Sequence, residues 1–198
     1  MTRTQKSLTI TLWALLVIAM VSFVASGMWR PREPEHFFEV PEFHLVDQNN
    51  KPFTKHELAG KVWIADFVFT QCAGPCPLMT LSMVELQKEL AGTPIQLVSI
   101  SVDPTRDTPE VLRKYAQSMK ADEKNWTFAT GEPDEVFSLA AAMKIPASPA
   151  DGQNSILHSE KFILVDEKGW IRGWYFYKDP EKRSQLIEEA RRLASKGS

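Results

Sequence analysis

Residues 62–77 read VWIADFVFTQCAGPCP, an apolar run followed by two cysteines and two prolines. Its first eight residues are almost continuously apolar, which is typical of a strand buried on both faces of a sheet. The two prolines near its end suit the first turn of a helix, where a backbone N–H is not needed. The stretch therefore predicts a central strand that leads at once into a helix, with Cys72 and Cys76 at the junction.

The helix after the cysteines is expected to pack one apolar side against the sheet. The apolar pattern of this segment is broad and covers more than a narrow stripe. The side chains expected to form its buried face are Leu78, Leu81, Met83, Val84, Leu86 and Leu90.

The rest of the chain alternates between strand and helix patterns. A hairpin is expected over residues 43–53, followed by a short helical turn with a capping box made by Thr54 and Glu57. Further strands are predicted at residues 95–102, 126–129, 162–166 and 170–177, and further helices after Thr108, Glu132 and Asp179. This order predicts an α/β fold with a mixed, partly parallel central sheet flanked by helices. A cysteine pair at the end of the first central strand resembles the arrangement of thioredoxin.

The N-terminal segment is predicted to be a membrane anchor. Residues 8–28 contain no charged side chain over 21 positions, which is long enough to cross a hydrocarbon core of roughly 30 Å. Arg3 and Lys6 precede this run and favour a cytoplasmic N-terminus. The alternative is a cleaved signal peptide, because Ala25-Ser26-Gly27 forms a small-residue cleavage site.

These segments define the expected organisation of the chain. Residues 1–7 are cytoplasmic, 8–28 span the membrane, 29–42 form a tether rich in proline and glutamate, and 43–198 form one domain. A bacterial inner membrane, with the domain on the periplasmic side, fits this order best. Beyond residue 30 the chain carries 20 basic and 25 acidic residues, which argues against nucleic acid as a partner.

The chain has two cysteines, and three residues separate them. Side chains four apart on a helical face are close enough for two sulfurs to share a metal ion or to form a disulfide. A helix N-terminus lowers the pKa of a thiol, so thiolate is expected near neutral pH. A purely structural disulfide is disfavoured, because so small a loop restricts the unfolded chain little. The spacing departs from the C-x-x-C of dithiol oxidoreductases, and paired sulfurs suit copper(I).

One histidine and two aspartates are candidates for the surroundings of the cysteines. His158 stands at the start of a predicted strand beside a loop rich in proline, alanine, serine and glycine, whereas His36, His44 and His56 are interpreted as surface residues. Asp103 and Asp107 follow the second central strand, at the same sheet edge as the cysteines. Structural roles, turning the chain and capping a helix, are enough to explain these two carboxylates, although their negative charge could also steer a partner.

Three ordered motifs carry a resemblance to a known family. TQCAGPCP at residues 70–77, SVDPTRDTP at 101–109 and HSEKFILVD at 158–166 with Gly169 together resemble the Sco/SenC family over about residues 40–195. The resemblance implies a membrane-anchored thioredoxin-like domain that binds copper, Cu(I) or Cu(II), through Cys72, Cys76 and His158. It places Asp103 and Asp107 near that site. The family often has proline after the first cysteine and aspartate before the histidine, where this chain has Ala73 and Leu157.

The leading functional hypothesis is a copper chaperone rather than an enzyme. It would deliver copper to a cytochrome c oxidase subunit that carries a copper centre, with other periplasmic copper chaperones or thiol reductants as further partners. The alternative is a thiol-disulfide oxidoreductase that keeps the cysteines of the oxidase copper site reduced, with Cys72 or Cys76 as nucleophile. A peroxidase role is weaker, since the sequence places no arginine to polarise a peroxide. His158 separates the first two hypotheses, because metal binding needs it and disulfide exchange does not.

Overall fold

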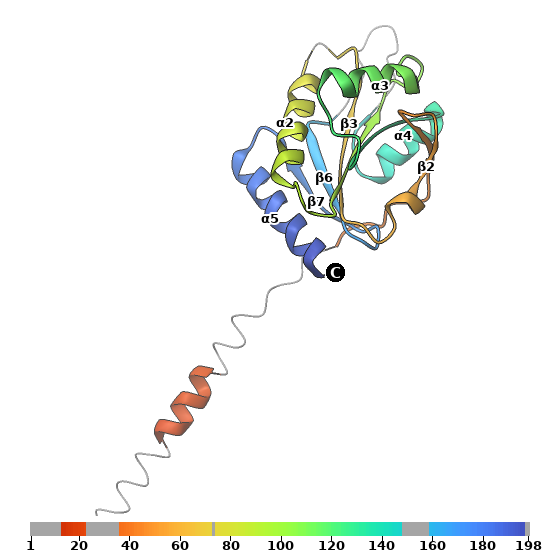
Figure 1. The fold of residues 1–198 in the computed structure, drawn as a ribbon. Helices are drawn as coiled ribbons and strands as arrows, with labels where there is room; N and C mark the ends of the chain where they lie inside the picture. The colour runs from red at the N-terminus through yellow and green to blue at the C-terminus, as the bar shows by residue number, and fades with distance from the viewer. Residues whose placement is uncertain (1–12, 23–35, 73, 148–158, 197–198) are drawn as a thin grey trace, which may run out of the picture. The chain divides into compact units, whose positions relative to one another are not determined.

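The computed structural model describes residues 13–22, 36–72, 74–147 and 159–196 (Figure 1). The chain divides into two units, Met1–Pro34 and Glu35–Ser198. In the first unit, residues 13–22 are helical and their side chains are exposed. In the described residues, no helix combines the length and the apolar character that a membrane crossing requires. The two ends of the expected anchor, residues 8–12 and 23–28, lie outside the described residues.

The second unit is built on a seven-stranded mixed sheet with the strand order β2-β1-β5-β4-β3-β6-β7. Strands β3, β4 and β5 are parallel to one another, whereas β1, β6 and β7 pair antiparallel to their neighbours. The strands are β1 (His44–Asp47), β2 (Pro52–Thr54), β3 (Trp63–Val68), β4 (Gln96–Ser101), β5 (Trp126–Thr130), β6 (Lys161–Val165) and β7 (Ile171–Phe176). All six residues of β3 are buried, as its apolar run predicts.

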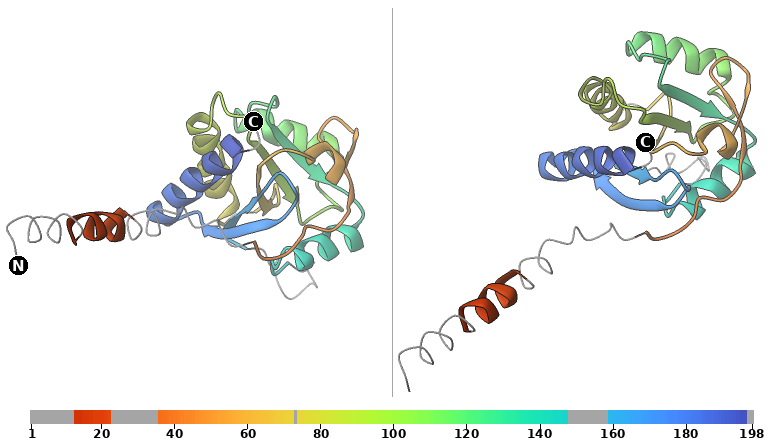
Figure 2. Two further views of the ribbon diagram at one scale, coloured as in Figure 1. Left: turned by 90° about the horizontal axis from the view of Figure 1, so that it is seen from below. Right: turned by 60° about the horizontal axis from the view of Figure 1, so that its bottom comes forward.

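Helices cover both faces of this sheet (Figure 2). One face is packed by α2 (Cys76–Glu89), α3 (Pro109–Ser118) and α5 (Pro180–Lys196). The other face is packed by α4 (Pro133–Ala142) and the 3-10 turn η1 (Lys55–Leu58). The α/β fold with a mixed sheet and flanking helices, predicted from the sequence, is confirmed.

Local signals set several of the element ends. The capping box is present, because the Thr54 side chain accepts from the backbone of η1 and Glu57 accepts from the Thr54 backbone. Thr108 caps α3, with its hydroxyl accepting from the Val111 N–H at 3.4 Å, and proline occupies the first helical position. Asp179 accepts from the first N–H groups of α5. These interactions supply partners for N–H groups that a helix cannot satisfy internally.

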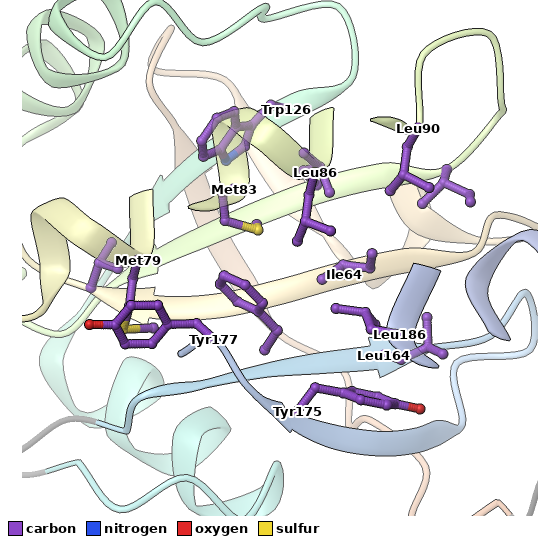
Figure 3. Close-up of a cluster of buried hydrophobic side chains, with 14 of the residues drawn as sticks. Ile64, Met79, Met83, Leu86, Leu90, Trp126, Leu164, Tyr175, Tyr177 and Leu186 are labelled. Atoms are coloured by element: carbon purple, nitrogen blue, oxygen red, sulfur yellow. The ribbon is translucent and has the colours of Figure 1, made fainter. Parts of the chain in front are cut away.

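The expected buried face of α2 is partly wrong. Leu78 and Leu81 are 56% and 49% exposed. The fully buried side chains of α2 include Cys76, Met79 and Met83. Met79 and Met83 belong to the same buried cluster as Ile64 of the sheet (Figure 3). Because α2 begins at Cys76 with this residue facing the sheet, positions three and four residues apart follow it onto the same side. The helix is apolar around much of its circumference, so sequence periodicity alone did not fix this orientation.

Part of the expected tether is bonded to the domain. The Phe37 N–H donates to the Ile171 carbonyl, and Glu39 forms an isolated antiparallel bridge with Trp170. Val40 is completely buried. The described residues before β1 are therefore hydrogen-bonded alongside the start of β7.

Candidate metal centre

The cysteine pair lies where β3 ends and α2 begins. The Val102 N–H donates to the Val68 carbonyl at 2.9 Å, which continues the pairing of β3 with the chain after β4. The chain then turns, and the Cys72 N–H donates to the Phe69 carbonyl at 3.3 Å. Cys76 is the first residue of α2. The two cysteines thus lie at opposite ends of one short loop: Cys72 follows β3, and Cys76 begins α2.

Both cysteines are reduced thiols that form no disulfide, and both are buried. Cys72 is 9% exposed and Cys76 is fully buried, so Cys72 is the more accessible sulfur. The Cys72 sulfur accepts a hydrogen bond from the Gly74 N–H at 3.4 Å. The two thiol side chains are near enough for Cys72 to affect the pKa of Cys76.

The expectation that the helix N-terminus would favour thiolate fails at Cys76. Burial raises the pKa of the Cys76 thiol well above its ordinary value, and the neighbouring Cys72 thiol raises it further. A backbone hydrogen bond at Phe69 opposes this rise only in part. Removing a thiolate from water costs more than the partial charge of one helix end returns. In the metal-free, reduced protein, Cys76 is therefore a protonated thiol at neutral pH.

Asp66 is a buried carboxyl group on the same side of the sheet as α2. It is fully buried in the middle of β3, and Ser99 of β4 lies opposite it in the register. Neither carboxyl oxygen has a hydrogen bond of ordinary geometry among the described residues. Burial raises the pKa of this carboxyl to about 7, and the Ser99 hydroxyl opposes only part of the rise. The charge of Asp66 also raises the pKa of Cys76, so the carboxyl and the thiol share one electrostatic environment.

Tyr115 of α3 joins the same environment. Its hydroxyl lies 2.9 Å from the Thr80 hydroxyl, which donates to the Cys76 carbonyl at 3.0 Å. Burial raises the pKa of Tyr115 to about 12, and the charges of Asp66 and the two cysteines add to the rise. Neither Asp66 nor Tyr115 was singled out from the sequence. The available signal for Asp66 was a single carboxylate inside an otherwise apolar strand.

The two predicted aspartates lie in the loop after β4. Asp103 is 6% exposed and organises the loop itself: it accepts from the Thr105 hydroxyl at 3.1 Å and pairs with Arg106 at 3.4 Å. Asp107 is fully buried and reaches the cysteine loop, because its carboxylate accepts from both the N–H and the hydroxyl of Thr70. Of the two aspartates, Asp107 is the one hydrogen-bonded to the loop that contains Cys72.

His158, the predicted third ligand, lies outside the described residues. The described chain resumes at Ser159, which is buried, and β6 begins at Lys161. Because β6 runs antiparallel to β3, its start lies at the sheet edge where β3 ends. Within the described ranges, no three His, Cys, Asp or Glu side chains form a group that could hold a metal ion. The described part of the site therefore contains two sulfur atoms as candidate ligands.

The sulfur pair fits two kinds of chemistry. Two adjacent thiols can lose their protons to a soft metal ion, and thiolate is a favoured ligand of copper(I). The same two thiols can be oxidised to a disulfide that closes a small loop.

The sequence of the domain matches one family over most of its length. The family described as SCO1/SenC matches residues 31–195. This chain belongs to the SCO1/SenC family.

Solved SCO1/SenC structures share the fold of this chain. A SCO1/SenC family lipoprotein from Bacillus anthracis str. Ames is 32% identical with a TM-score of 0.73, covering 84% of this chain and 98% of that chain. BsSco, a Sco family cytochrome c oxidase assembly protein with an identified disulfide switch, is 30% identical with a TM-score of 0.73, covering 83% and 97%. Yeast Sco1 with copper bound is 26% identical with a TM-score of 0.62, covering 78% and 90%. The family thus contains copper-bound members and a member with a disulfide switch.

Proposed function

We propose that this protein is a copper chaperone that binds one copper ion and delivers it for assembly of a cytochrome c oxidase copper centre. The observation that carries the proposal is the pair of buried thiols, Cys72 and Cys76, between the end of β3 and the start of α2, in a member of a family with copper-bound structures. The membership of BsSco in a family of oxidase assembly proteins supports the choice of target.

His158 is proposed to complete the ligand set. Two thiolates suit copper(I), and an added imidazole extends the site to copper(II). The antiparallel pairing of β6 with β3 supports this role, since it brings the start of β6 to the sheet edge where the cysteines lie. A site of two thiolates and one imidazole leaves the ion open to attack by a ligand of the receiving protein, which allows transfer by ligand exchange.

Residues 8–28 are proposed to anchor the domain to the bacterial inner membrane, on its periplasmic side. The support for a spanning anchor is the uncharged run of 21 residues with basic residues before it. The lipoprotein character of the relative from Bacillus anthracis supports membrane association only. A periplasmic reporter fused after Ser198 is expected to be active in a membrane-bound protein. Recovery of a soluble chain beginning near Met28 would instead show signal cleavage.

Copper stoichiometry tests the site directly. The reduced full-length protein is expected to bind one copper ion, and Cys72→Ser and Cys76→Ser are each expected to abolish tight binding, because one thiolate with one imidazole is a poor chelate. His56→Ala, at an exposed position of η1, is the control for loss of a histidine elsewhere. Undiminished stoichiometry in either cysteine variant would refute the ligand assignment.

The second candidate function is thiol-disulfide exchange, and the unequal burial of the two thiols favours it. Cys72, the more exposed sulfur, would attack a target disulfide as thiolate, forming a mixed disulfide and releasing one target thiol. Cys76 would lose its proton and attack the Cys72 sulfur, releasing the second target thiol. The target gains two electrons and two protons, and this protein is left with a Cys72–Cys76 disulfide. A reductant of the thiol class must then restore it.

A further inference from the structure

The loop that carries Cys72 is held by one buried carboxylate from another part of the chain. Asp107 Oδ2 accepts from the Thr70 N–H at 3.0 Å, and Oδ1 accepts from the Thr70 hydroxyl at 2.5 Å. The Ser101 hydroxyl donates to Oδ2 at 2.6 Å. Asp107 itself is fully buried. Both oxygens of the carboxylate are thus engaged, and three donors converge on it.

The donors come from two segments that meet at the end of the sheet where β3 and β4 finish and the cysteine loop begins. Ser101 is the last residue of β4, and Thr70 lies two residues after β3 and two residues before Cys72. Asp107 is fixed in turn by its own loop, because its N–H and that of Arg106 both donate to the Asp103 carbonyl. The carboxylate therefore joins a preorganised loop to the start of the cysteine loop.

These contacts are expensive to lose. Hydrogen bonds to an ionised carboxylate are stronger than hydrogen bonds between neutral groups. When one partner of a buried hydrogen bond is removed, the remaining polar group cannot bond to water instead. Within the described residues no lysine, arginine or histidine pairs with Asp107, so neutral donors alone stabilise its charge. Arg106, the nearest cation in sequence, pairs with Asp103 instead.

We propose that Asp107 is a positioning residue for the sulfur pair, a role that rests on the proposed function of the cysteines. The two ends of the cysteine loop are fixed by different means. At one end, α2 fixes Cys76 as its first residue. At the other end, the Cys72 N–H donates to the Phe69 carbonyl, and Asp107 holds Thr70 through both its N–H and its hydroxyl.

Holding Thr70 restricts where the Cys72 sulfur can lie relative to Cys76. A chelate and a disulfide both require two sulfurs at a defined separation, and a loosened loop must be ordered again each time either bond forms. Outer contacts that orient metal ligands typically change metal affinity by roughly 10- to 100-fold when they are removed. Asp107 acts through Thr70 and touches neither the metal nor the target.

The test compares Asp107→Asn with Asp166→Asn in the reduced full-length protein. Asp166 is the matched control: it is 1% exposed and likewise accepts several hydrogen bonds, from Lys168, Trp170 and Arg172, but it lies after β6 in the turn to β7. Copper(I) affinity is measured by competition with a chromophoric chelator, and the thiolate-to-copper(II) absorption is recorded. Asp107→Asn is expected to keep one copper per chain, to weaken copper(I) binding roughly 10- to 100-fold and to shift the absorption band. Asp166→Asn is expected to lower the unfolding midpoint and to leave affinity and absorption unchanged.

Two further variants cover the case in which Asp107→Asn does not fold. Thr70→Val removes the hydroxyl bond and retains the backbone bond, so it is expected to shift affinity and absorption in the same direction by a smaller amount. Thr70→Ser keeps the hydroxyl and is expected to restore the wild-type values. Wild-type affinity and absorption in both Asp107→Asn and Thr70→Val would overturn the proposal.

A wild-type protein that binds no copper would refute the proposed function, and the positioning role is then decided by the dithiol–disulfide equilibrium alone. Asp107→Asn is expected to shift that equilibrium roughly tenfold toward the dithiol, which is about 30 mV less negative for a two-electron couple. An unchanged potential in this variant would overturn the positioning role.

Discussion

Replacing Asp66 by asparagine is expected to change how the stability of the domain depends on pH. Burial raises the pKa of this carboxyl to about 7 in the folded protein, against about 3.9 for an exposed aspartate in the unfolded chain. Well below pH 4 the group is neutral in both states, so its ionisation contributes no cost. As the pH rises from 4 to 7, the unfolded chain releases this proton while the folded protein retains it, so the free energy of unfolding falls.

The size of the effect follows from the difference between the two pKa values. About 3 units at about 1.4 kcal/mol each give a cost on the order of 4 kcal/mol that is complete above pH 7. Between pH 5 and pH 8 the cost grows by about 3 kcal/mol, since part of it is already present at pH 5. An asparagine side chain has nearly the same shape and no ionisable proton, so the Asp66→Asn variant lacks this pH-dependent cost throughout the range.

Urea unfolding of both proteins across pH 5 to 8, with reductant and a copper chelator present, measures the difference. The free energy of unfolding of Asp66→Asn minus that of the wild type is expected to increase by about 3 kcal/mol over this range. Asp134→Asn, the same change at an exposed position of α4, controls for the chemistry of the substitution. A difference that stays constant from pH 5 to pH 8 would refute the raised pKa of the buried Asp66.

Two further predictions follow from burial at the site and in α2. In the reduced protein Cys72 is expected to react with iodoacetamide faster than Cys76, because Cys72 is 9% exposed and Cys76 is fully buried. Equal labelling of the two cysteines in peptide mass spectrometry would contradict this. Met83→Ala is expected to cost about 2 to 5 kcal/mol of stability and Leu81→Ala less than about 1, since one side chain is buried and the other 49% exposed. Equal losses in urea unfolding would place the wrong face of α2 against the sheet.

The elements around the cysteines could be predicted because their signals are local. An unbroken apolar run is enough for β3, and Thr54 and Thr108 with their following residues define two helix starts. The position of the cysteines at the end of β3 follows from the same stretch of chain. These patterns depend on a few neighbouring residues and are not overridden by the rest of the fold.

The properties that depend on packing could not be predicted in the same way. The orientation of α2 is set by the sheet beneath it, so Leu78 and Leu81 were assigned to the wrong face. The pKa of Cys76 is controlled by burial beneath the surrounding chain, which outweighs the helix end that the sequence reveals. Asp66 belongs to the same class, because only the tertiary structure shows that its carboxyl lacks ordinary hydrogen bonds among the described residues.

Copper delivery, as opposed to thiol reduction, is tested most directly by the cytochrome c oxidase of cells that carry His158→Ala. The variant retains Cys72 and Cys76, so disulfide exchange of the purified protein with a small thiol is expected to stay normal. Copper(II) binding is expected to weaken much more than copper(I) binding, since two thiolates can still hold copper(I). If copper delivery is the function, these cells are expected to fail to assemble an oxidase with its full copper content and activity. Full oxidase assembly despite lost copper(II) binding would contradict it and would leave the two cysteines as the whole active site of a thiol-disulfide oxidoreductase.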